Sequence, residues 1–216
     1  MNPDLSVDNS LSINKGLFVV CEGVDKAGKT TVINYAQNKL DSLLKEDQKT
    51  VYNKGLGGES FLGKVSSNYP CTFLFLLQQL YFDKCRLNEE LELGKIVFQD
   101  RWFYSVISYP GNDLKDDLVA ELMIPPLRRP DLLVYFTCSL EERLRRLDEH
   151  RTVEHLKLIN DPARIMLWEE RLMKYYQNFS GNKYLLDTTV KSVEASGEEL
   201  VRLVNEQIMF YDKKRL

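Results

Sequence analysis

Gly-Val-Asp-Lys-Ala-Gly-Lys-Thr, residues 23–30, is the stretch that decides the fold. It has the spacing G-x-x-x-x-G-K-[ST], it follows the apolar run at residues 17–21, and apolar side chains recur after it at helical spacing. The pattern predicts a strand, a tight loop and a helix. Inward-pointing backbone N–H groups and the positive N-terminus of the helix make such a loop a site for a polyphosphate.

The side chains of this loop have separate expected roles. Lys29 is expected to reach the β- and γ-phosphates, and Thr30 to place its hydroxyl on Mg²⁺. A chance match to the pattern would be rare, and the surrounding strand and helix make it rarer. The residues of the loop that we expect to bind the nucleotide are Gly23, Asp25, Ala27, Gly28, Lys29, Thr30 and Thr31.

The composition is typical of a soluble globular protein, with 44% hydrophobic and 28% charged residues in 216. The net charge of −3 disfavours a nucleic-acid partner, because proteins that bind phosphate backbones usually carry a basic excess. The four cysteines are scattered, which predicts neither a zinc site nor disulfides and favours a cytoplasmic location. No apolar run is long enough to cross a membrane. We expect a flexible arm at residues 1–15 and one domain at residues 16–216.

Strands and helices are predicted to alternate along the chain. This alternation indicates an α/β fold in which a five-stranded parallel sheet is covered by helices on both faces. The expected strands span residues 17–21, 50–53, 95–99, 131–136 and 184–186. The expected helices carry the apolar stripe at residues 32–44 and span 71–93, 140–149, 160–179 and 193–210.

Polar residues follow two of the predicted strands, at the edge of the sheet where ligands of α/β proteins bind. Asp100 could bind Mg²⁺ or orient an attacking oxygen, and Arg101 could clamp a phosphate, although pairing with neighbours or solvent would also explain both residues. Residues 54–60 hold three glycines within four positions. They form either a plain loop or a segment that touches substrate.

Two further groups of polar residues have a functional and a structural explanation. Arg143, Arg145, Arg146 and Arg151 form either a solvated helix face or a basic segment that closes over a transferring group, with Arg151 best placed in the break between helices. Gln78 and Gln79 interrupt the apolar half of the helix at 71–93. Such groups need partners, which either a bound base or ordinary hydrogen bonds would supply.

Several of these stretches together resemble the thymidylate kinase family of nucleoside monophosphate kinases. Residues 22–31 look like that family's phosphate loop, and residues 100–105 with Tyr109 and Gly111 are similar to its second signature. Residues 54–60, 130–132 and 187–189 carry weaker likenesses, the last of them to the loop on the adenine side. The resemblance implies a P-loop kinase fold with a short lid, a homodimer, and Mg²⁺-dependent transfer of the ATP γ-phosphoryl group to a deoxynucleoside 5′-monophosphate.

The resemblance also implies residue roles. Asp25 would touch the sugar 3′-OH or the metal shell, and Arg101 the acceptor phosphate. Lys26 and Arg151 are alternative cations for bridging the donor and acceptor phosphates, and Tyr109 would disfavour a ribose 2′-OH. The expected catalytic residues are Lys26, Lys29, Asp100, Arg101 and Arg151, and the expected metal ligands are Thr30 and Asp100. Arg146, Asp187 and Thr188 complete the ATP site, and the acceptor site comprises Asp25, Lys54, Gly57, Phe75, Gln78, Gln79, Arg101, Ser105 and Tyr109.

The departures from the family concern the base. Counting back twenty residues from Asp100, to where the family has an Arg that reads thymine, leads to Leu80. The expected stacking Phe falls four residues earlier on Leu76, one place from Phe75, and Val106 occupies a position that is polar in many members.

A pocket without a donor would leave the thymine carbonyl unpaired, and such losses are large in a dry site. Thymidylate is therefore one candidate acceptor, and Gln78 and Gln79 are candidates for reading another base, such as a modified pyrimidine or a purine.

Other functions stay open at this point. A deoxynucleoside kinase would need a carboxylate base in place of a phosphate clamp, and a degenerate relative would bind nucleotides without catalysis. A GTP-binding switch is disfavoured, because residues 53–56 begin like the guanine-reading Asn-Lys-x-Asp but lack its Asp.

Overall fold

The strand β1, Leu17–Gly23, lies at the centre of the sheet and is buried along its whole length. The structure is a computed structural model that describes residues 16–54, 68–108, 127–148 and 162–213. β1 pairs in parallel with β3 (Ile96–Asp100) and with β4 (Leu132–Thr137). β2 (Val51–Lys54) and β5 (Lys183–Asp187) complete a parallel sheet of order β2-β3-β1-β4-β5, which confirms the predicted fold class.

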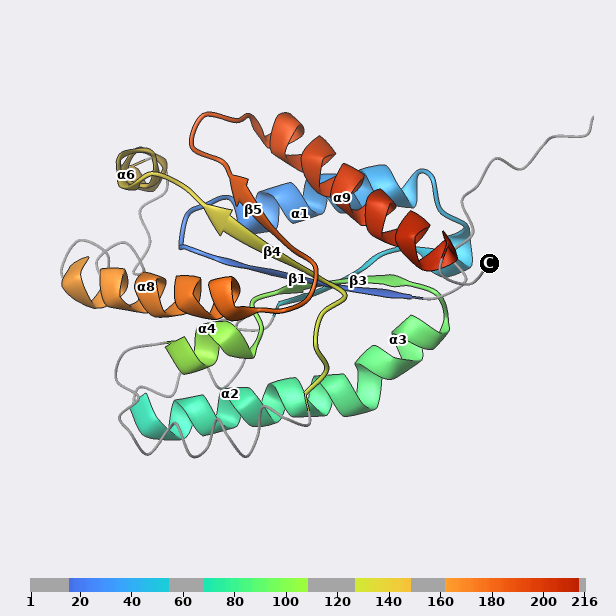
Figure 1. Ribbon diagram of the computed structural model, residues 1–216, viewed down its shortest axis with the longest axis horizontal. Helices are drawn as coiled ribbons and strands as arrows, with labels where there is room; N and C mark the ends of the chain where they lie inside the picture. Colours follow the sequence, from blue (N-terminus) through green and yellow to red (C-terminus); the bar gives the residue numbers. More distant parts are fainter. Residues whose placement is uncertain (1–15, 55–67, 109–126, 149–161, 214–216) are drawn as a thin grey trace, which may run out of the picture.

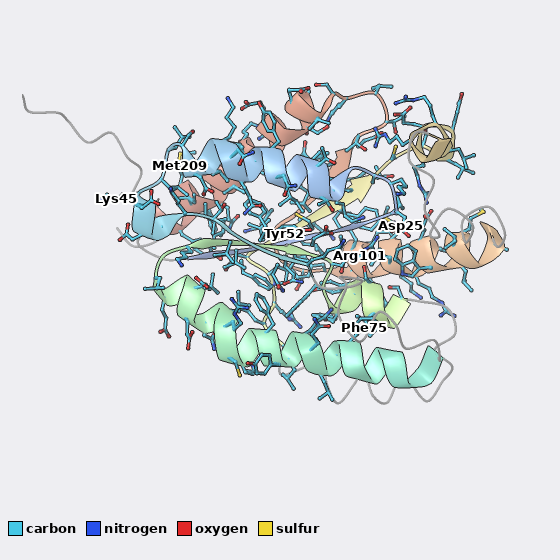
Figure 2. The ribbon with its side chains drawn as sticks, turned by 180° about the vertical axis from the view of Figure 1, so that it is seen from behind. Asp25, Lys45, Tyr52, Phe75, Arg101 and Met209 are labelled. Carbon is cyan, nitrogen blue, oxygen red and sulfur yellow. The ribbon has the colours of Figure 1, made fainter. Side chains whose placement is uncertain are left out.

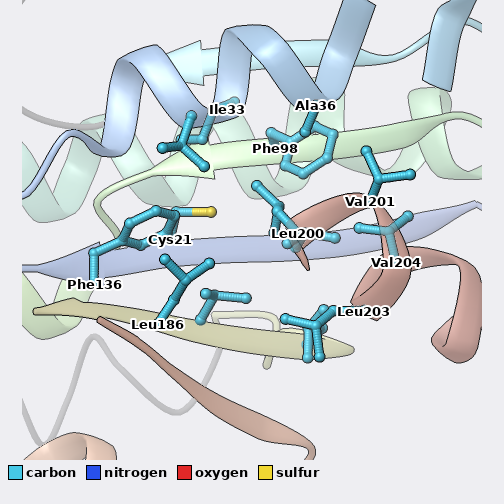
Figure 3. Close-up of a cluster of buried hydrophobic side chains, with 14 of the residues drawn as sticks. Cys21, Ile33, Ala36, Phe98, Phe136, Leu186, Leu200, Val201, Leu203 and Val204 are labelled. Carbon is cyan, nitrogen blue, oxygen red and sulfur yellow. The ribbon is translucent and has the colours of Figure 1, made fainter. Parts of the chain in front are cut away.

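Two helices cover one face of the sheet, namely α1 (Lys29–Asp41) and α9 (Val193–Lys213) (Figure 1). The apolar stripe predicted after the phosphate loop lies on α1, where Ile33 and Ala36 are fully buried. They share a core with Phe98 of β3 and with residues of α9 (Figure 3). A short 3₁₀ turn, η1 (Glu46–Gln48), then leads to β2.

The other face is covered by α2 (Asn68–Phe82), α3 (Asn88–Glu92), α4 (Phe103–Ser108) and α8 (Pro162–Asn178) (Figure 1). Trp102 is fully buried in this layer and meets Phe18 of β1 edge to face, with ring centroids 5.4 Å apart. The single helix expected at 71–93 is α2 followed by a π-helical turn, η3 (Asp83–Leu87), and then α3. No helix in the described ranges is both long and apolar enough to span a membrane.

The parallel order brings the carboxyl ends of the strands to one edge, where α6 (Leu140–Asp148) also lies (Figure 1). Cys21 pairs with Asp100 at the end of β3, so the loops after β1 and β3 leave the sheet side by side. On the other side of β1, Gly23 pairs with Phe136 of β4. Gly23 has φ of +132°, and a Cβ there would come within 2.0 Å of the Phe136 carbonyl oxygen. Only glycine fits at this start of the loop.

Candidate active site

The loop between β1 and α1 has the geometry that its sequence predicts. Gly28 caps α1 in the left-handed conformation at φ 79°, and Lys26 also has a positive φ of 63°. Lys29 Nζ donates to the carbonyl oxygens of Gly23 and Val24, at 3.1 and 2.8 Å. Burial, and then the charge of Arg101, lower the pKa of Lys29 to about 8. A buried ammonium at a helix N-terminus is a strong site for phosphate oxygens.

Asp100 ends β3 beside the first residues of α1 and is buried. Its Oδ2 accepts hydrogen bonds from Thr30 Oγ1 at 2.8 Å and from Tyr52 OH at 2.9 Å. Burial, and then the charge of Asp100, raise the pKa of Tyr52. A carboxylate and a hydroxyl beside a phosphate loop fit Mg²⁺, which commonly takes one or two protein oxygens together with water and phosphate. The sequence indicated Thr30 and Asp100, but nothing in it pointed to Tyr52.

Arg101 follows β3 at φ 68° and turns its side chain towards the phosphate loop. Its Nη1 donates to the Gly23 carbonyl at 3.2 Å and to Ser105 Oγ at 3.0 Å, and its guanidinium forms an ion pair with Asp25 (Figure 2). The guanidinium carbon lies 5.0 Å from the centroid of the Trp168 ring. Desolvation alone would raise the pKa of Asp25, but the positive charges led by Arg101 hold it below its usual value.

Glu22, just before the loop, is a buried carboxylate that sequence reasoning did not single out. It accepts the backbone N–H groups of Trp102 at 2.8 Å and Ser105 at 3.2 Å, and it also accepts the Ser105 hydroxyl. Burial raises the pKa of Glu22. Glu22 thus caps the start of α4, and Ser105 bridges Glu22 to Arg101. Ser105, which we expected at the acceptor site, lies beside Arg101 and accepts a hydrogen bond from its guanidinium.

The arginines of α6 differ in what they contact. Arg143 is buried, and its Nε donates to the Asp25 carbonyl at 2.8 Å while its fork binds Glu169 of α8 at 2.5 and 3.0 Å. Arg145 pairs with Glu142 on the surface. The basic segment is therefore partly a brace for the phosphate loop.

Arg146 and Thr188, both expected at the ATP site, meet over that loop. Arg146 donates to the carbonyl oxygens of Lys26 at 3.1 Å and Thr188 at 2.7 Å. The Thr188 hydroxyl donates to the Ala27 carbonyl at 2.9 Å, and Asp187 accepts hydrogen bonds from Thr189. The structure thus brings the loop after β5, α6 and the phosphate loop together.

The residues of α2 that were counted along the sequence lie in or beside the core. Leu76 is fully buried in the core, Leu80 packs against the same core, and Gln79 is buried at 2% exposure beside a cavity. A π turn takes up one residue more than an α turn, so η3 shifts every position before it by one. Relative to a helix without that turn, the expected pair would fall on Phe75 and Gln79.

The remaining predicted residues are placed as follows. Lys54 is exposed at the end of β2, and Thr31 is exposed in the first turn of α1. Val106 is buried in the core of the α4 layer. Gly57, Tyr109 and Arg151 lie outside the described residues.

Known proteins resemble this chain over most of its length. A comparison with protein families matches residues 21–200 to the family described as thymidylate kinase. A protein of Thermococcus gammatolerans named probable thymidylate kinase is 27% identical over 90% of this chain and 98% of its own. The thymidylate kinase of Neorickettsia sennetsu is 26% identical over 89% of this chain and 96% of its own.

Solved structures show the same fold. The thymidylate kinase of Candida albicans matches with a TM-score of 0.70 and 19% identity, over 90% of this chain and 94% of its own. Together with the match to residues 21–200, the phosphate loop and the Asp100-Arg101 pair place this chain in the thymidylate kinase family of ATP-dependent nucleoside monophosphate kinases.

Proposed function

We propose that this protein transfers the γ-phosphoryl group of ATP to the 5′-phosphate of thymidylate or a related deoxynucleoside monophosphate, with Mg²⁺. The observation that carries the proposal is the second cation at the phosphate loop. Lys29 lies inside the loop, while Arg101 faces it from the next strand through Asp25 and the Gly23 carbonyl. A loop that holds one polyphosphate needs such a guanidinium fork when the acceptor also ends in a phosphate.

The mechanism asks for position and charge neutralisation, since phosphoryl transfer needs little covalent help from the protein. The backbone of the loop and Lys29 hold the donor phosphates, and Arg101 exchanges its contacts with Asp25 for the acceptor phosphate. Arg146 and Thr188 stand at the nucleoside end of ATP. Lys26 and Arg151 stay the alternative cations between the two phosphates. Bound Mg²⁺, held by Thr30 and Asp100, would supply further neutralisation of the phosphate charge.

A panel of acceptors tests this proposal. Each deoxynucleoside monophosphate and its unphosphorylated nucleoside is incubated with ATP and Mg²⁺, and the products are separated by charge. We expect diphosphates from monophosphates and no product from nucleosides. The carboxylates of Glu22 and Asp100 already accept hydrogen bonds from the protein, which disfavours either of them as the base that a nucleoside hydroxyl would need. Phosphorylation of nucleosides alone would overturn the proposal. A homodimer, which the resemblance implies, stays a prediction.

The lowered pKa of Lys29 predicts a pH dependence of ATP binding. Above the pKa of about 8 the free protein holds a neutral lysine, which must take up a proton when phosphate binds. The dissociation constant for ATP should therefore rise roughly tenfold per pH unit above that value. Calorimetric titrations from pH 7 to 9.5, in buffers with different ionisation enthalpies, would show the affinity and the proton uptake. A profile that is flat up to pH 9.5 would contradict the role of Lys29.

Asp100→Asn tests the metal site. The amide oxygen can still accept from Thr30 and Tyr52, but the charge is lost, so we expect turnover to fall on the order of 100-fold and the Mg²⁺ requirement to rise. Tyr52→Phe is the matched control, because it removes one hydrogen bond to Asp100 and leaves its charge. Rates measured against free Mg²⁺ should separate the two variants. An unchanged Mg²⁺ curve in Asp100→Asn would remove Asp100 from the metal site.

Glu22→Gln tests the support behind Arg101. A glutamine cannot accept two backbone N–H groups and the Ser105 hydroxyl with the strength of a carboxylate, so α4 and Arg101 should be held less firmly. We expect the KM of the acceptor to rise about tenfold while the KM of ATP stays near that of the wild type. Ser105→Ala should show a smaller change in the same direction. Equal losses for both substrates would mean that Glu22 acts on the loop as a whole.

A further inference from the structure

A cavity lies against α2 on the side of β2. It has a volume of about 160 Å³. This is more than ten times the roughly 10–15 Å³ that a single water requires. The cavity is therefore large enough for part of a planar ring. Its lining consists of Asn53, Gln78, Gln79, Tyr81, Phe82 and Arg86.

The amide of Gln79 has no hydrogen-bond partner among the described residues. Gln79 is only 2% exposed, yet neither its Nε2 nor its Oε1 is paired, and Gln78 Oε1 is unpaired as well. Buried polar groups in native proteins almost always have partners, so an unpaired amide that lines a cavity points to a ligand. Gln207 on the opposite face also has an unpaired Nε2, but its Oε1 accepts from Asn182.

Hydrogen bonds link the wall of the cavity to the backbone of Arg101. Asn53 Nδ2 in this wall donates to Gln99 Oε1 at 2.7 Å, and Gln99 Nε2 donates to the Arg101 carbonyl at 2.7 Å. Phe75 lies one helical turn before Gln79, and Figure 2 shows it below Arg101. If Arg101 holds the acceptor phosphate, this cavity lies where the other end of the same nucleotide would extend.

We propose that Gln79 reads the acceptor base, and that its amide admits both 4-oxo and 4-amino pyrimidine deoxynucleoside monophosphates; this rests on the proposed function. An amide presents one acceptor and two donors on the same plane. In one orientation it pairs with N3–H and O4 of thymine, and turned over it pairs with N3 and the 4-amino group of cytosine.

The unpaired state of Gln79 leaves both orientations available. An arginine at this position offers donors only, so it would match O4 of thymine and oppose the amino group of cytosine.

Steady-state kinetics with thymidylate and deoxycytidylate test the proposal. The wild type should use the two acceptors with kcat/KM values within about tenfold of each other. Gln79→Arg should lower kcat/KM for deoxycytidylate relative to thymidylate by about 100-fold or more, because a donor would then face a donor. Gln79→Glu should shift the preference the opposite way, since a carboxylate accepts from the amino group and repels O4. Gln79→Leu should weaken both acceptors about equally.

The control is Gln207→Leu, which changes a buried glutamine on the opposite face and should leave the ratio unchanged. Thermal unfolding of each variant checks that it folds. If Gln79→Arg does not fold, Gln79→Glu still tests the proposal. A wild-type preference of about 1000-fold for one acceptor, or a ratio that no Gln79 variant changes, would overturn the inference. Failure of the wild type to phosphorylate either monophosphate would instead overturn the proposed function. Calorimetric binding of both monophosphates, lost in Gln79→Leu, would then still support base reading.

Discussion

Lys29→Ala is expected to abolish phosphoryl transfer while the domain still folds. Lys29 is the one side chain of the phosphate loop whose ammonium is buried against the loop's own carbonyl groups. It is placed to neutralise charge on the transferring group, and charge neutralisation is the main contribution of the protein in this chemistry. We therefore expect kcat/KM to fall by on the order of 1000-fold or more.

The stability of the Lys29 variant follows from its lowered pKa. Because the folded pKa of about 8 lies below the ordinary value of 10.5, the unfolded chain holds more protons between these pH values. The free energy of unfolding therefore rises with pH across that window, and below it the buried ammonium destabilises the fold by roughly 3 kcal/mol. Removing the ammonium group relieves this destabilisation, which offsets the loss of the hydrogen bonds of Lys29 to the Gly23 and Val24 carbonyl groups.

Circular dichroism and denaturant unfolding should show that the Lys29→Ala protein is folded, although it is inactive. Lys39→Ala is the matched control, since Lys39 lies on the exposed side of the same helix and pairs only with Glu198 among the described ion pairs. It should retain normal turnover. Near-normal turnover in Lys29→Ala would contradict the assignment of the loop.

Arg101→Lys is expected to damage acceptor use far more than ATP use. The guanidinium contacts the Gly23 carbonyl, Ser105 and Asp25 together, and a lysine keeps the charge but loses the fork. The KM of the acceptor should rise, and kcat/KM for it should fall by roughly 100- to 1000-fold. The KM of ATP should change by no more than about twofold.

Initial-rate kinetics with each substrate varied in turn would separate these effects. Arg128→Lys is the control, because Arg128 is a half-buried arginine that binds Asn88 at the start of α3. A collapse of ATP affinity with unchanged acceptor kinetics would mean that the two sites are reversed.

The architecture and the loop chemistry could be predicted because they are local in sequence. The strand, loop and helix around Lys29 follow from spacing, and parallel order brings Thr30 and Asp100 together at the carboxyl edge although they are far apart in the chain. The expected strands match the observed ones to within about two residues at each end.

The contacts that position the site could not be predicted, because they depend on packing between distant elements. Glu22 is one residue of the phosphate-loop stretch 22–31, and only the fold shows that its carboxylate caps α4. Arg143 looks like any surface arginine on a helix, yet it is buried against Glu169. The π turn after α2 has no clear sequence signal, so counting along the sequence could not include the extra residue that it takes up.

The most direct test of the central claim uses ATP that carries a label in its γ-phosphoryl group and identifies the product in which the label appears. With thymidylate and Mg²⁺, the label should appear in the β-phosphate of thymidine diphosphate, with one ADP formed for each diphosphate. Transfer should disappear in Lys29→Ala. Label that appears only in inorganic phosphate, or that enters thymidine but not thymidylate, would contradict the account of Arg101 as the clamp for an acceptor phosphate.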